Sequence, residues 1–249
     1  MQTILNYLKG IFAPRHEQEL PNCLTANTPI TKQLFQTAPS RQPKYVVKML
    51  QQHLSDPWEY RQFNDSEIRD FMLANPLEEF PNIYEKFLSL KKGAHKADLF
   101  RYYYLYVNGG LFLDSDAMLY TDIDSVTNRC SFVSVNSSCH PGTIFQGILG
   151  ACPHHPFIYL ALKDAYKISN KKLHKNYHQL CQNLYTIVVN NSALADAKLY
   201  TEKRIQGAGY DHILDESSEV IFKHYWQDKH IPADLFHRHT AGCTAETLS

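Results

Sequence analysis

The sequence lacks three features that would each assign it to a different class of protein. It has no run of about 18 consecutive apolar residues, so no segment is expected to span a membrane. It has no excess of charge of one sign, since 25 basic side chains balance 25 acidic ones, which argues against a nucleic-acid binder that works through a basic field. Its six cysteines include no CxxC pair, which predicts reduced thiols.

The N-terminal segment also lacks the features of a secretory signal. The stretch MQTILNYLKGIFAPR has an apolar bias, but it has no basic n-region and no long h-region. It is typical of a short amphipathic helix that packs on the domain or touches a membrane surface. We therefore expect residues 1–26 to be a leader that packs on a domain of residues 27–249, with peripheral membrane contact as the alternative. A cytoplasmic location is expected.

Strand-like and helix-like patterns alternate through the first half of the chain. Short β-compatible runs are expected as strands at 30–37, 58–63, 111–114, 130–135, 143–149 and 219–222. Apolar residues at helical spacing predict helices at 45–54, 64–72, 83–88 and 94–107, then from Pro156 onward and over 173–188. No repeat, low-complexity segment or linker interrupts this order. The pattern predicts an α/β fold, a single domain with an open, Rossmann-like sheet whose ligands bind at strand carboxyl ends.

The best-defined stretch is ADLFRYYYLYVNGGLFLDSD, residues 97–116. Glycine accepts positive φ, so Gly109 and Gly110 are expected to stop the helix before a buried strand. Asp98 and Arg101 are three residues apart and project toward one side of that helix. Such a pair is often a weak surface ion pair, but this helix is rich in apolar and aromatic residues. A charged pair in a buried helix usually serves a ligand or a polar network.

Two aspartates, Asp114 and Asp116, directly follow the expected central strand. Asp and Ser favour turns, so a polar turn is the simplest interpretation, and D-x-D alone is a weak motif. In this context, hard oxygen ligands suit Mg²⁺ or Mn²⁺, which share their coordination with substrate phosphates. Such a metal would neutralise a departing diphosphate.

These residues together resemble the DXD signature of glycosyltransferase family 32, which includes fungal mannosyltransferases and animal galactosyl- and N-acetylglucosaminyltransferases. Upstream, TPITKQLFQT is similar to the family's first strand, with Phe35 where His is usual. Downstream, TIFQGILGACPHHPF is similar to a segment in which Gln146 stands near the family's usual Asn, and His155-Pro156 match its His-Pro. The resemblance covers roughly residues 27–165. It implies a GT-A fold that binds a nucleotide sugar and retains the anomeric configuration.

The resemblance also implies roles for residues around the donor. Gln36 and Thr37 would seat the base and ribose at the end of the first strand. Asp98 would fix sugar hydroxyls, and Arg101 would spread positive charge over the diphosphate. Gly110 would let the chain turn tightly beneath the donor.

For the metal, the resemblance implies Mn²⁺ or Mg²⁺ bound with the nucleotide. Asp116 would ligate it directly, and Asp114 would contact ribose or sugar hydroxyls and help the metal site. A third ligand is expected near the C-terminus, where His224 follows the apolar EVIF; His212 and His230 are its rivals.

The function that the resemblance implies is transfer of a hexose from a UDP-sugar or GDP-mannose to a hydroxyl of a glycan or other acceptor. No protein nucleophile is identifiable, so the leaving phosphate oxygen would take the acceptor's proton. Two other functions stay open. A metal-dependent phosphohydrolase would need further ligands, for which Asp122 and Asp124 are near in sequence. A carbohydrate-binding pseudo-transferase would keep the fold without turnover. His154-His155 are expected to open a helix, and Trp58 to anchor a strand.

Overall fold

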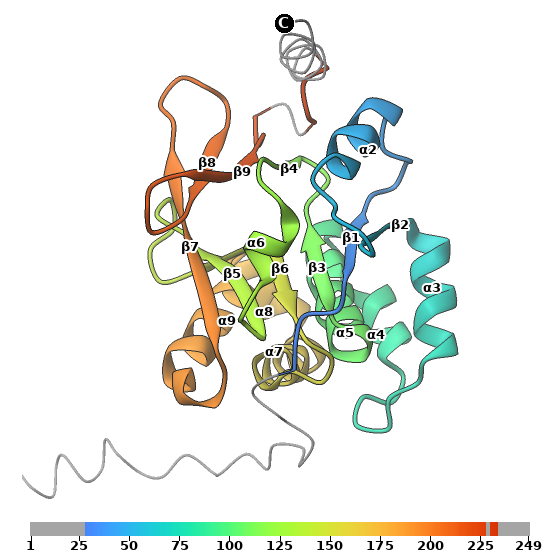
Figure 1. Ribbon diagram of the computed structural model, residues 1–249. Coiled ribbons are helices and arrows are strands. Elements are labelled where there is room, and N and C mark those ends of the chain that lie inside the picture. Colours follow the sequence, from blue (N-terminus) through green and yellow to red (C-terminus); the bar gives the residue numbers. More distant parts are fainter. Residues whose placement is uncertain (1–27, 228–229, 234–249) are drawn as a thin grey trace, which may run out of the picture.

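A mixed sheet forms the centre of the part of the chain that the structure describes, residues 28–227 and 230–233. In this computed structural model the nine strands follow the order β2-β1-β3-β6-β5-β7-β8-β9-β4 (Figure 1). The β1–β2, β1–β3 and β5–β7 pairs are parallel, and the other pairs are antiparallel. The strands are β1 (Gln33–Thr37), β2 (Glu59–Phe63), β3 (Gly110–Leu113), β4 (Ala117–Leu119), β5 (Phe132–Asn136), β6 (Ile144–Ala151), β7 (Ala197–Arg204), β8 (Asp211–Leu214) and β9 (Val220–His224).

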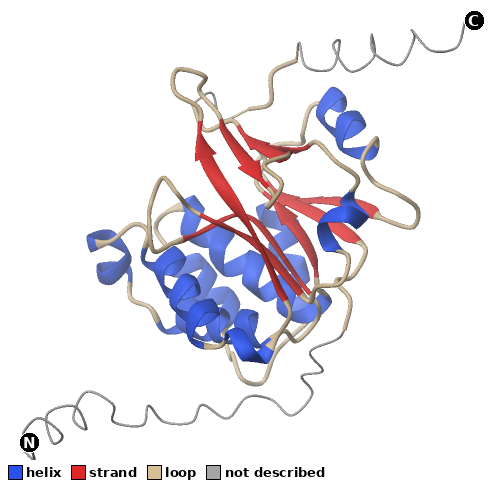
Figure 2. Ribbon diagram, turned by 60° about the vertical axis from the view of Figure 1, so that its left-hand side comes forward, coloured by secondary structure: helices blue, strands red, loops and turns tan. Residues whose placement is uncertain are grey.

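Helices cover both faces of this sheet, so each face has its own apolar core (Figure 2). The larger core lies under α3 (Asp65–Ala74), α4 (Ile83–Ser89), α5 (Gly93–Asn108), α7 (Pro156–Lys167), α8 (Asn170–Lys175) and α9 (Gln179–Asn190). The smaller core lies under α2 (Lys44–Gln51) and α6 (Ile123–Thr127). The predicted fold class, a single α/β domain with helices flanking one sheet, is confirmed. Within the described residues no helix is both long and apolar enough to cross a membrane. The predicted leader, residues 1–26, lies outside the described residues.

The two cores follow from the alternation of side chains along each strand. In β1 and β3, Phe35 and Phe112 enter the larger core, while Leu34 and Leu111 enter the smaller one. Helix α5 packs on the larger core and is buried nearly all round. Its Tyr104 ring lies 4.2 Å from the ring of Phe35, centroid to centroid. The tyrosines at 102, 103, 104 and 106 are all buried, so they serve mainly to pack this helix on the sheet.

Helix boundaries with clear local chemistry are where the sequence predicts them. Asn64 caps α3: its Oδ1 accepts a hydrogen bond from the Glu67 N–H at 3.0 Å, and Glu67 Oε2 accepts one from the Asn64 N–H at 2.9 Å. Gly109 ends α5 at φ 69°, and its N–H donates to the Leu105 carbonyl at 2.9 Å. Both predictions are confirmed.

The single long helix predicted over 173–188 is wrong, because the chain breaks between α8 and α9. Asn176 leaves the helical conformation at φ −138° and ψ 101°, and its Oδ1 accepts from the His178 N–H at 3.2 Å. A short polar side chain that bonds to nearby backbone competes with helix continuation. The break places Tyr177 and His178 at a cavity instead of on a helix face.

The loop Asp114–Asp116 joins two strands that lie far apart in the sheet. β3 is third in the strand order and β4 is last, yet these three residues alone connect them. The sheet therefore curls until β4, paired with β9, returns beside the carboxyl end of β3. The DXD sequence is therefore the connection between β3 and β4 at the place where the sheet curls back on itself.

Helix α7 begins at Pro156 and is capped by His155, so the prediction that this segment opens a helix is confirmed. His155 Nδ1 accepts from the Phe157 N–H at 3.2 Å, which leaves the proton of the neutral ring on Nε2, 3.4 Å from Ser131 Oγ. The side chain is almost fully buried, and burial lowers the pKa of His155 to about 3.

Because the pKa of His155 is lowered in the folded protein, we expect the free energy of unfolding to fall in mild acid. The unfolded chain binds a proton at His155 below pH 6.5, whereas the folded chain does not until near its lowered pKa. The stabilisation is therefore complete above the unfolded pKa, and we expect about 2 kcal/mol of it to be lost between pH 6.5 and 4.5. Urea unfolding at both pH values should show a smaller loss for His155→Asn, which keeps a capping acceptor. Equal losses in the two proteins would contradict the prediction.

Candidate active site

The Asp114–Asp116 loop is held in place mainly by its backbone. The Asp114 N–H donates to the Gly147 carbonyl at 2.7 Å, and the Asp114 carbonyl accepts from Gln36 Nε2 at 3.0 Å. The Ser115 carbonyl accepts from Gln42 Nε2 at 2.7 Å. The loop's position thus does not depend on its carboxylates, which stay available for a ligand.

Gly147 makes room for one of those carboxylates. A Cβ atom on Gly147 would lie 2.5 Å from Asp114 Oδ2 and 2.3 Å from the tip of the Phe145 ring. Real Cβ atoms do not approach other atoms this closely, so a larger residue on β6 would displace the Asp114 carboxylate.

Asp116 faces His224 across the β4–β9 pair. The Asp116 carbonyl accepts from the Tyr225 N–H at 2.8 Å, and its Oδ1 lies 3.6 Å from His224 Nε2. Burial would lower the pKa of His224, but the neighbouring carboxylates of Asp116 and Asp114 outweigh it and raise that pKa. Two ligand atoms on one octahedral cation lie about 3 Å apart, so a small closure would let this pair share a metal.

Arg101 on α5 joins two carboxylates at the floor of the site. Its Nη2 lies 3.4 Å from Asp98 Oδ1 and 3.4 Å from Asp114 Oδ1. Its Nη1 donates to the Gln146 carbonyl, and its guanidinium lies 4.1 Å from the centre of the Phe112 ring. Burial raises the pKa of Asp98, and the charge of Arg101 opposes this rise. The predicted pair is thus not a surface ion pair: it is a buried network extending to the DXD loop.

Two cavities meet at this network. The first, of about 330 Å³, is lined by Asp98, Arg101, Asp114, Gln146 and His224, with residues from β7, β8 and the α8–α9 break. The second, of about 440 Å³, is lined by Thr37 and by residues of α3 and of the start of α5. Arg101 and Asp114 belong to both linings, so a ligand that fills both cavities must pass the guanidinium.

Of the predicted nucleotide contacts, Thr37 lines the second cavity, but Gln36 and Gly110 line neither. Gln36 is fully buried, and its Oε1 accepts from the Tyr60 hydroxyl at 2.8 Å while its amide holds the DXD loop. A Cβ atom on Gly110 would lie 2.6 Å from the Gln33 carbonyl oxygen. Both residues therefore affect the site indirectly. Gln36 holds the Asp114–Asp116 loop through a hydrogen bond, and Gly110 lets β3 lie close to β1.

Among the three histidines predicted as a metal ligand, His224 lies with the aspartates. His224 and Asp114 line the first cavity, whereas His212 and His230 do not. His212 is on the other face of β8, where it pairs in register with Lys223 and its ring stacks at 5.4 Å on that of Tyr210. Two carboxylates and one imidazole are a donor set that suits Mn²⁺.

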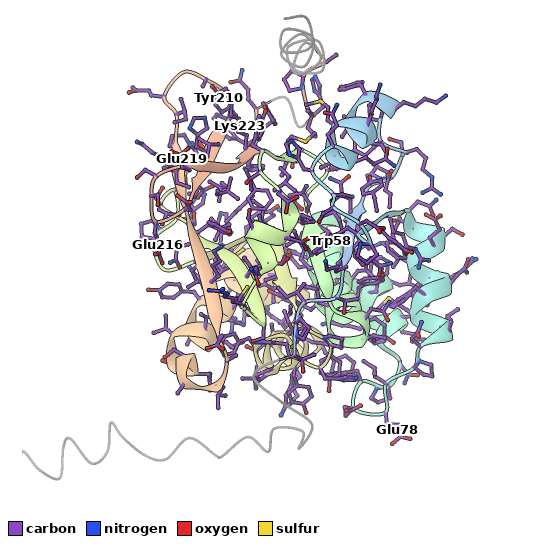
Figure 3. All side chains as sticks on the ribbon, in the orientation of Figure 1. Trp58, Glu78, Tyr210, Glu216, Glu219 and Lys223 are labelled. Atoms are coloured by element: carbon purple, nitrogen blue, oxygen red, sulfur yellow. The ribbon has the colours of Figure 1, made fainter. Side chains whose placement is uncertain are left out.

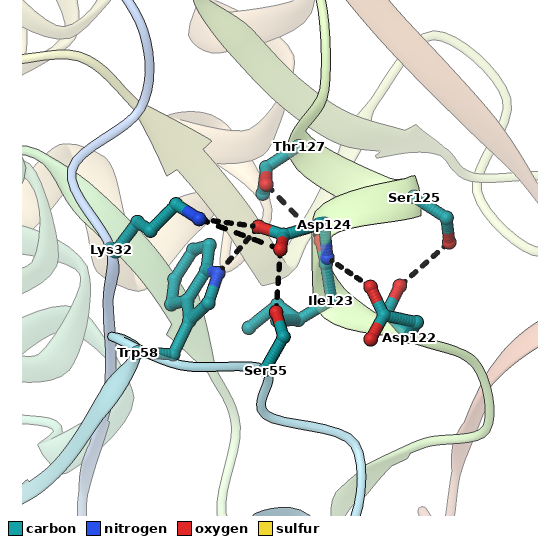
Figure 4. Close-up of polar contacts among 8 residues, drawn as sticks. All are labelled: Lys32, Ser55, Trp58, Asp122, Ile123, Asp124, Ser125 and Thr127. Carbon is teal, nitrogen blue, oxygen red and sulfur yellow. Dashed lines mark hydrogen bonds and ion pairs between the residues drawn. The ribbon is translucent and has the colours of Figure 1, made fainter.

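The aspartates on which a phosphohydrolase would depend are occupied elsewhere. Asp124 accepts from Trp58 Nε1 at 2.8 Å and from Ser55 Oγ at 2.5 Å, and Lys32 Nζ lies 3.2 Å away (Figure 4). The hydrogen bonds from Ser55 and Trp58 lower the pKa of Asp124. Asp122 caps α6 through the Asp124 N–H. Neither aspartate lines the two cavities, and Trp58 anchors the entry to β2 as predicted.

The sequence analysis missed one wall of the first cavity. Strands β7 and β8 contribute Glu202, Arg204 and Asp211, and the β5–β6 loop contributes Cys139. Ligand atoms of Cys139, Glu202 and Asp211 lie within 4.8 Å of one another, and Arg204 Nε lies 2.7 Å from Asp211 Oδ1. In β7 only Tyr200 and Glu202 are buried, so the strand has no apolar run by which it could be recognised.

The chain is similar in sequence to known glycosyltransferases. Residues 31–133 match the family model described as a glycosyltransferase sugar-binding region containing a DXD motif. Over 226 residues, 84% of the chain and 61% of its relative, the chain is 25% identical to inositol phosphoceramide mannosyltransferase 2 of Schizosaccharomyces pombe. It is 26% identical over 144 residues, 55% of each chain, to an uncharacterized glycosyltransferase of Acanthamoeba polyphaga mimivirus.

Among solved structures, the PaToxG glycosyltransferase aligns with a TM-score of 0.47 at 14% identity, over 66% of this chain and 70% of that one. The chain spans only 61% and 55% of the lengths of the two curated relatives.

Proposed function

Since the chain is a glycosyltransferase of the family 32 type, we propose that it transfers a hexose from a nucleotide-diphosphate sugar to a hydroxyl group, with retention of configuration and dependence on a divalent metal. The donor is a UDP-sugar or GDP-mannose, and the acceptor is a glycan or another hydroxyl compound. The similarity to a mannosyltransferase of Schizosaccharomyces pombe supports mannose as the first donor sugar to test. A cytoplasmic location and a peripheral membrane contact stay predictions.

The observation that supports this proposal most is an unpaired amide beside the Arg101 network. Both polar side-chain atoms of Gln146 are buried without a hydrogen-bond partner in the described part of the chain, and Gln146 lines the first cavity. A buried amide without partners is costly, and sugar hydroxyls both donate and accept. The sugar of a donor bound here would satisfy Gln146, while the carboxylate of Asp98 would accept from further hydroxyls.

The two cavities suit the two halves of such a donor. The second cavity, which contains Thr37 and the amino end of α5, would hold the nucleotide, and Lys91 and Lys96 add positive charge to its lining. The sugar would extend into the first cavity, so that the diphosphate lies at Arg101 where the cavities meet. A guanidinium presents several donors in one plane and is well suited to phosphate oxygens.

Asp116, Asp114 and His224 would hold the metal, which when bound neutralises charge on the leaving diphosphate. The chain's own residues position the reactants. Arg101 stabilises the diphosphate as its bond to the anomeric carbon breaks, and Asp98 and Gln146 fix the sugar ring. The acceptor oxygen bonds to the same face of that carbon, and the departing phosphate oxygen takes the acceptor's proton.

A donor panel tests this function. The protein is incubated with UDP- and GDP-sugars and Mn²⁺, with and without EDTA, and free nucleotide is measured. Release from one or two sugar nucleotides that EDTA abolishes is the expected result. Hydrolysis of simple phosphoesters would indicate the phosphohydrolase instead, and binding without release would indicate the pseudo-transferase. Full activity without metal would contradict the metal dependence.

His224, at the end of β9, is the proposed metal ligand that a single substitution can test. Changing His224 to alanine should raise the Mn²⁺ concentration for half-maximal activity about tenfold or more, because one ligand is lost. Titration of Mn²⁺ binding by electron paramagnetic resonance measures this directly. His212→Ala is the matched control, since His212 lies on the other face of β8, and it should leave the Mn²⁺ requirement unchanged. An unaltered requirement in the His224 variant removes it from the site.

A further inference from the structure

Four carboxylates line the first cavity, and one of them forms no ion pair within the part of the chain that the structure describes. Asp98 and Asp114 share the guanidinium at the cavity floor, and Asp211 pairs with Arg204 at 2.7 Å. Glu202 makes no ion pair with any residue in the described ranges, although the side chain is 4% exposed. An almost buried carboxylate without a cation needs hydrogen-bond donors from elsewhere.

The protein supplies such donors to one oxygen of Glu202. Ser137 Oγ donates to Oε2 at 2.5 Å, and the Cys139 N–H donates to the same atom at 3.4 Å. The His140 N–H donates to Ser137 Oγ at 3.1 Å, so the serine hydroxyl proton is directed toward Glu202. In the described part of the chain neither the Ser137 hydroxyl nor the Cys139 N–H reaches the other oxygen, Oε1, and the Cys139 thiol, a weak donor, also contacts the carboxylate. Glu202 is thus fixed through Oε2, which leaves Oε1 for a ligand.

The position of Glu202 separates it from the donor residues. It lies on β7, three strands from β3 in the sheet order, whereas Asp114 directly follows β3. Glu202 is paired in register with Ile213, and Ile213 with Phe222, so Glu202 projects from the same face of the sheet as His224. It therefore faces the cavity that contains the proposed metal site, from a wall that no predicted donor residue forms.

Neighbouring side chains on this wall suit a sugar-like ring. Trp226 is 36% exposed and lines the cavity, with the Arg204 guanidinium 4.8 Å from its ring centre. The rings of His140 and His178 lie 4.3 Å apart at the same cavity. Arg204 already has Asp211 as its counter-ion, so this wall offers no free cation for an anionic group. An uncharged polyhydroxyl compound fits it best.

We propose that Glu202 is an acceptor-binding residue: its Oε1 accepts a hydrogen bond from a hydroxyl of an uncharged polyol and holds that polyol in the first cavity in preference to water. This inference rests on the proposed function. It requires no covalent step at Glu202, because the acceptor's proton still leaves with the phosphate oxygen.

The test separates acceptor use from donor use. Wild type and Glu202→Gln are incubated with the active sugar nucleotide, Mn²⁺ and graded methyl α-D-mannopyranoside or glycerol, and released nucleotide and glycosylated product are both measured. Losing a hydrogen bond to a charged group should lower the ratio of transfer to hydrolysis at least about tenfold. Hydrolysis without polyol, and the Kd for nucleotide with Mn²⁺, should stay within about twofold, because the variant is isosteric and leaves the donor residues in place.

Two further variants make the test specific. Glu216→Gln is the matched control: Glu216 is exposed in the β8–β9 turn at the edge of the molecule (Figure 3), and this variant should behave as wild type. Ser137→Ala removes the hydroxyl that donates to Glu202 Oε2 but leaves the charge of Glu202 in place. It should therefore lower the ratio of transfer to hydrolysis less than Glu202→Gln does. It also keeps the test valid if Glu202→Gln folds poorly.

Several results would overturn the proposal. They are an unchanged ratio in the Glu202 and Ser137 variants, a parallel loss of hydrolysis and transfer, or a wild type that hydrolyses its donor but glycosylates neither polyol. A protein that consumes no sugar nucleotide at all contradicts the proposed function itself, and the inference about Glu202 with it.

Discussion

Replacing Asp116 with alanine is expected to lower sugar transfer at least about a thousandfold, because the variant would lose the proposed direct metal ligand and the charge stabilisation that depends on it. Folding should be nearly unaffected. The loop is held through backbone groups, including the bond from the Tyr225 N–H to the Asp116 carbonyl, and alanine keeps all of them. Thermal unfolding should therefore shift by no more than about 2 °C.

Asp124→Ala is the matched control for this variant and should show the opposite behaviour. Its carboxylate accepts hydrogen bonds from Trp58 and Ser55 but lines neither cavity. We expect the melting temperature to fall by a few degrees, a loss of about 1 kcal/mol of stability, since the partly buried donors Ser55 and Trp58 lose their acceptor. Turnover per folded molecule should stay near wild type. Activity in the Asp116 variant, or a selective loss of activity in the Asp124 variant, would contradict the assignment of the metal site.

Changing Arg101 to lysine is expected to lower kcat about a hundredfold or more. One guanidinium contacts the carboxylates of Asp98 and Asp114 and the Gln146 carbonyl, and an ammonium cannot reach all three with the same geometry. The charge is kept, so loss of the planar donor set is the main change. Because Arg101 is buried, the melting temperature should also fall by a few degrees.

The comparison of activity with stability decides the role of Arg101. Arg41→Lys provides the control, since Arg41 makes an exposed ion pair with Glu67 and should tolerate the change in both measurements. If Arg101→Lys unfolds readily while its remaining folded fraction transfers sugar at the normal rate, the Arg101 network serves the fold and not the donor.

The parts of the site that the sequence predicts are those encoded by local chemistry. Asp114 and Asp116 follow a buried strand, and the helix before it ends at Gly109, so a short stretch specifies strand, turn and carboxylates together. Asp98 and Arg101 are recognisable because charges are unusual on a helix otherwise rich in apolar and aromatic residues. Asp98, Arg101 and Asp114 do meet in the structure, at one network between two cavities, whereas Asp116 lies beside His224 and lines neither cavity.

The remaining residues of the site come together through pairing between strands that are distant in the sequence, and no local pattern specifies that pairing. Strand β7 has the sequence AKLYTEKR, whose charged residues leave no apolar run, and Glu202 becomes part of a cavity only because β7 pairs with β5 and β8. Gln36 is a residue whose position was predicted but whose contact was not. Its place at the end of the first strand was predicted, but its amide bonds to the loop of another strand, and this contact is visible only once both strands are placed.

The closure of the sheet by the β4–β9 pair has a consequence for the protein's synthesis. Asp114 and Asp116 are translated in the first half of the chain, yet the strand that positions β4, together with His224 and the Tyr225 N–H, follows about a hundred residues later. A nascent chain that stops before Val220 has the DXD sequence without the strand that completes its loop. The surroundings of the Asp114–Asp116 loop are therefore completed late in synthesis, and a truncated product would carry the motif without the strand that brings His224 to the proposed metal site.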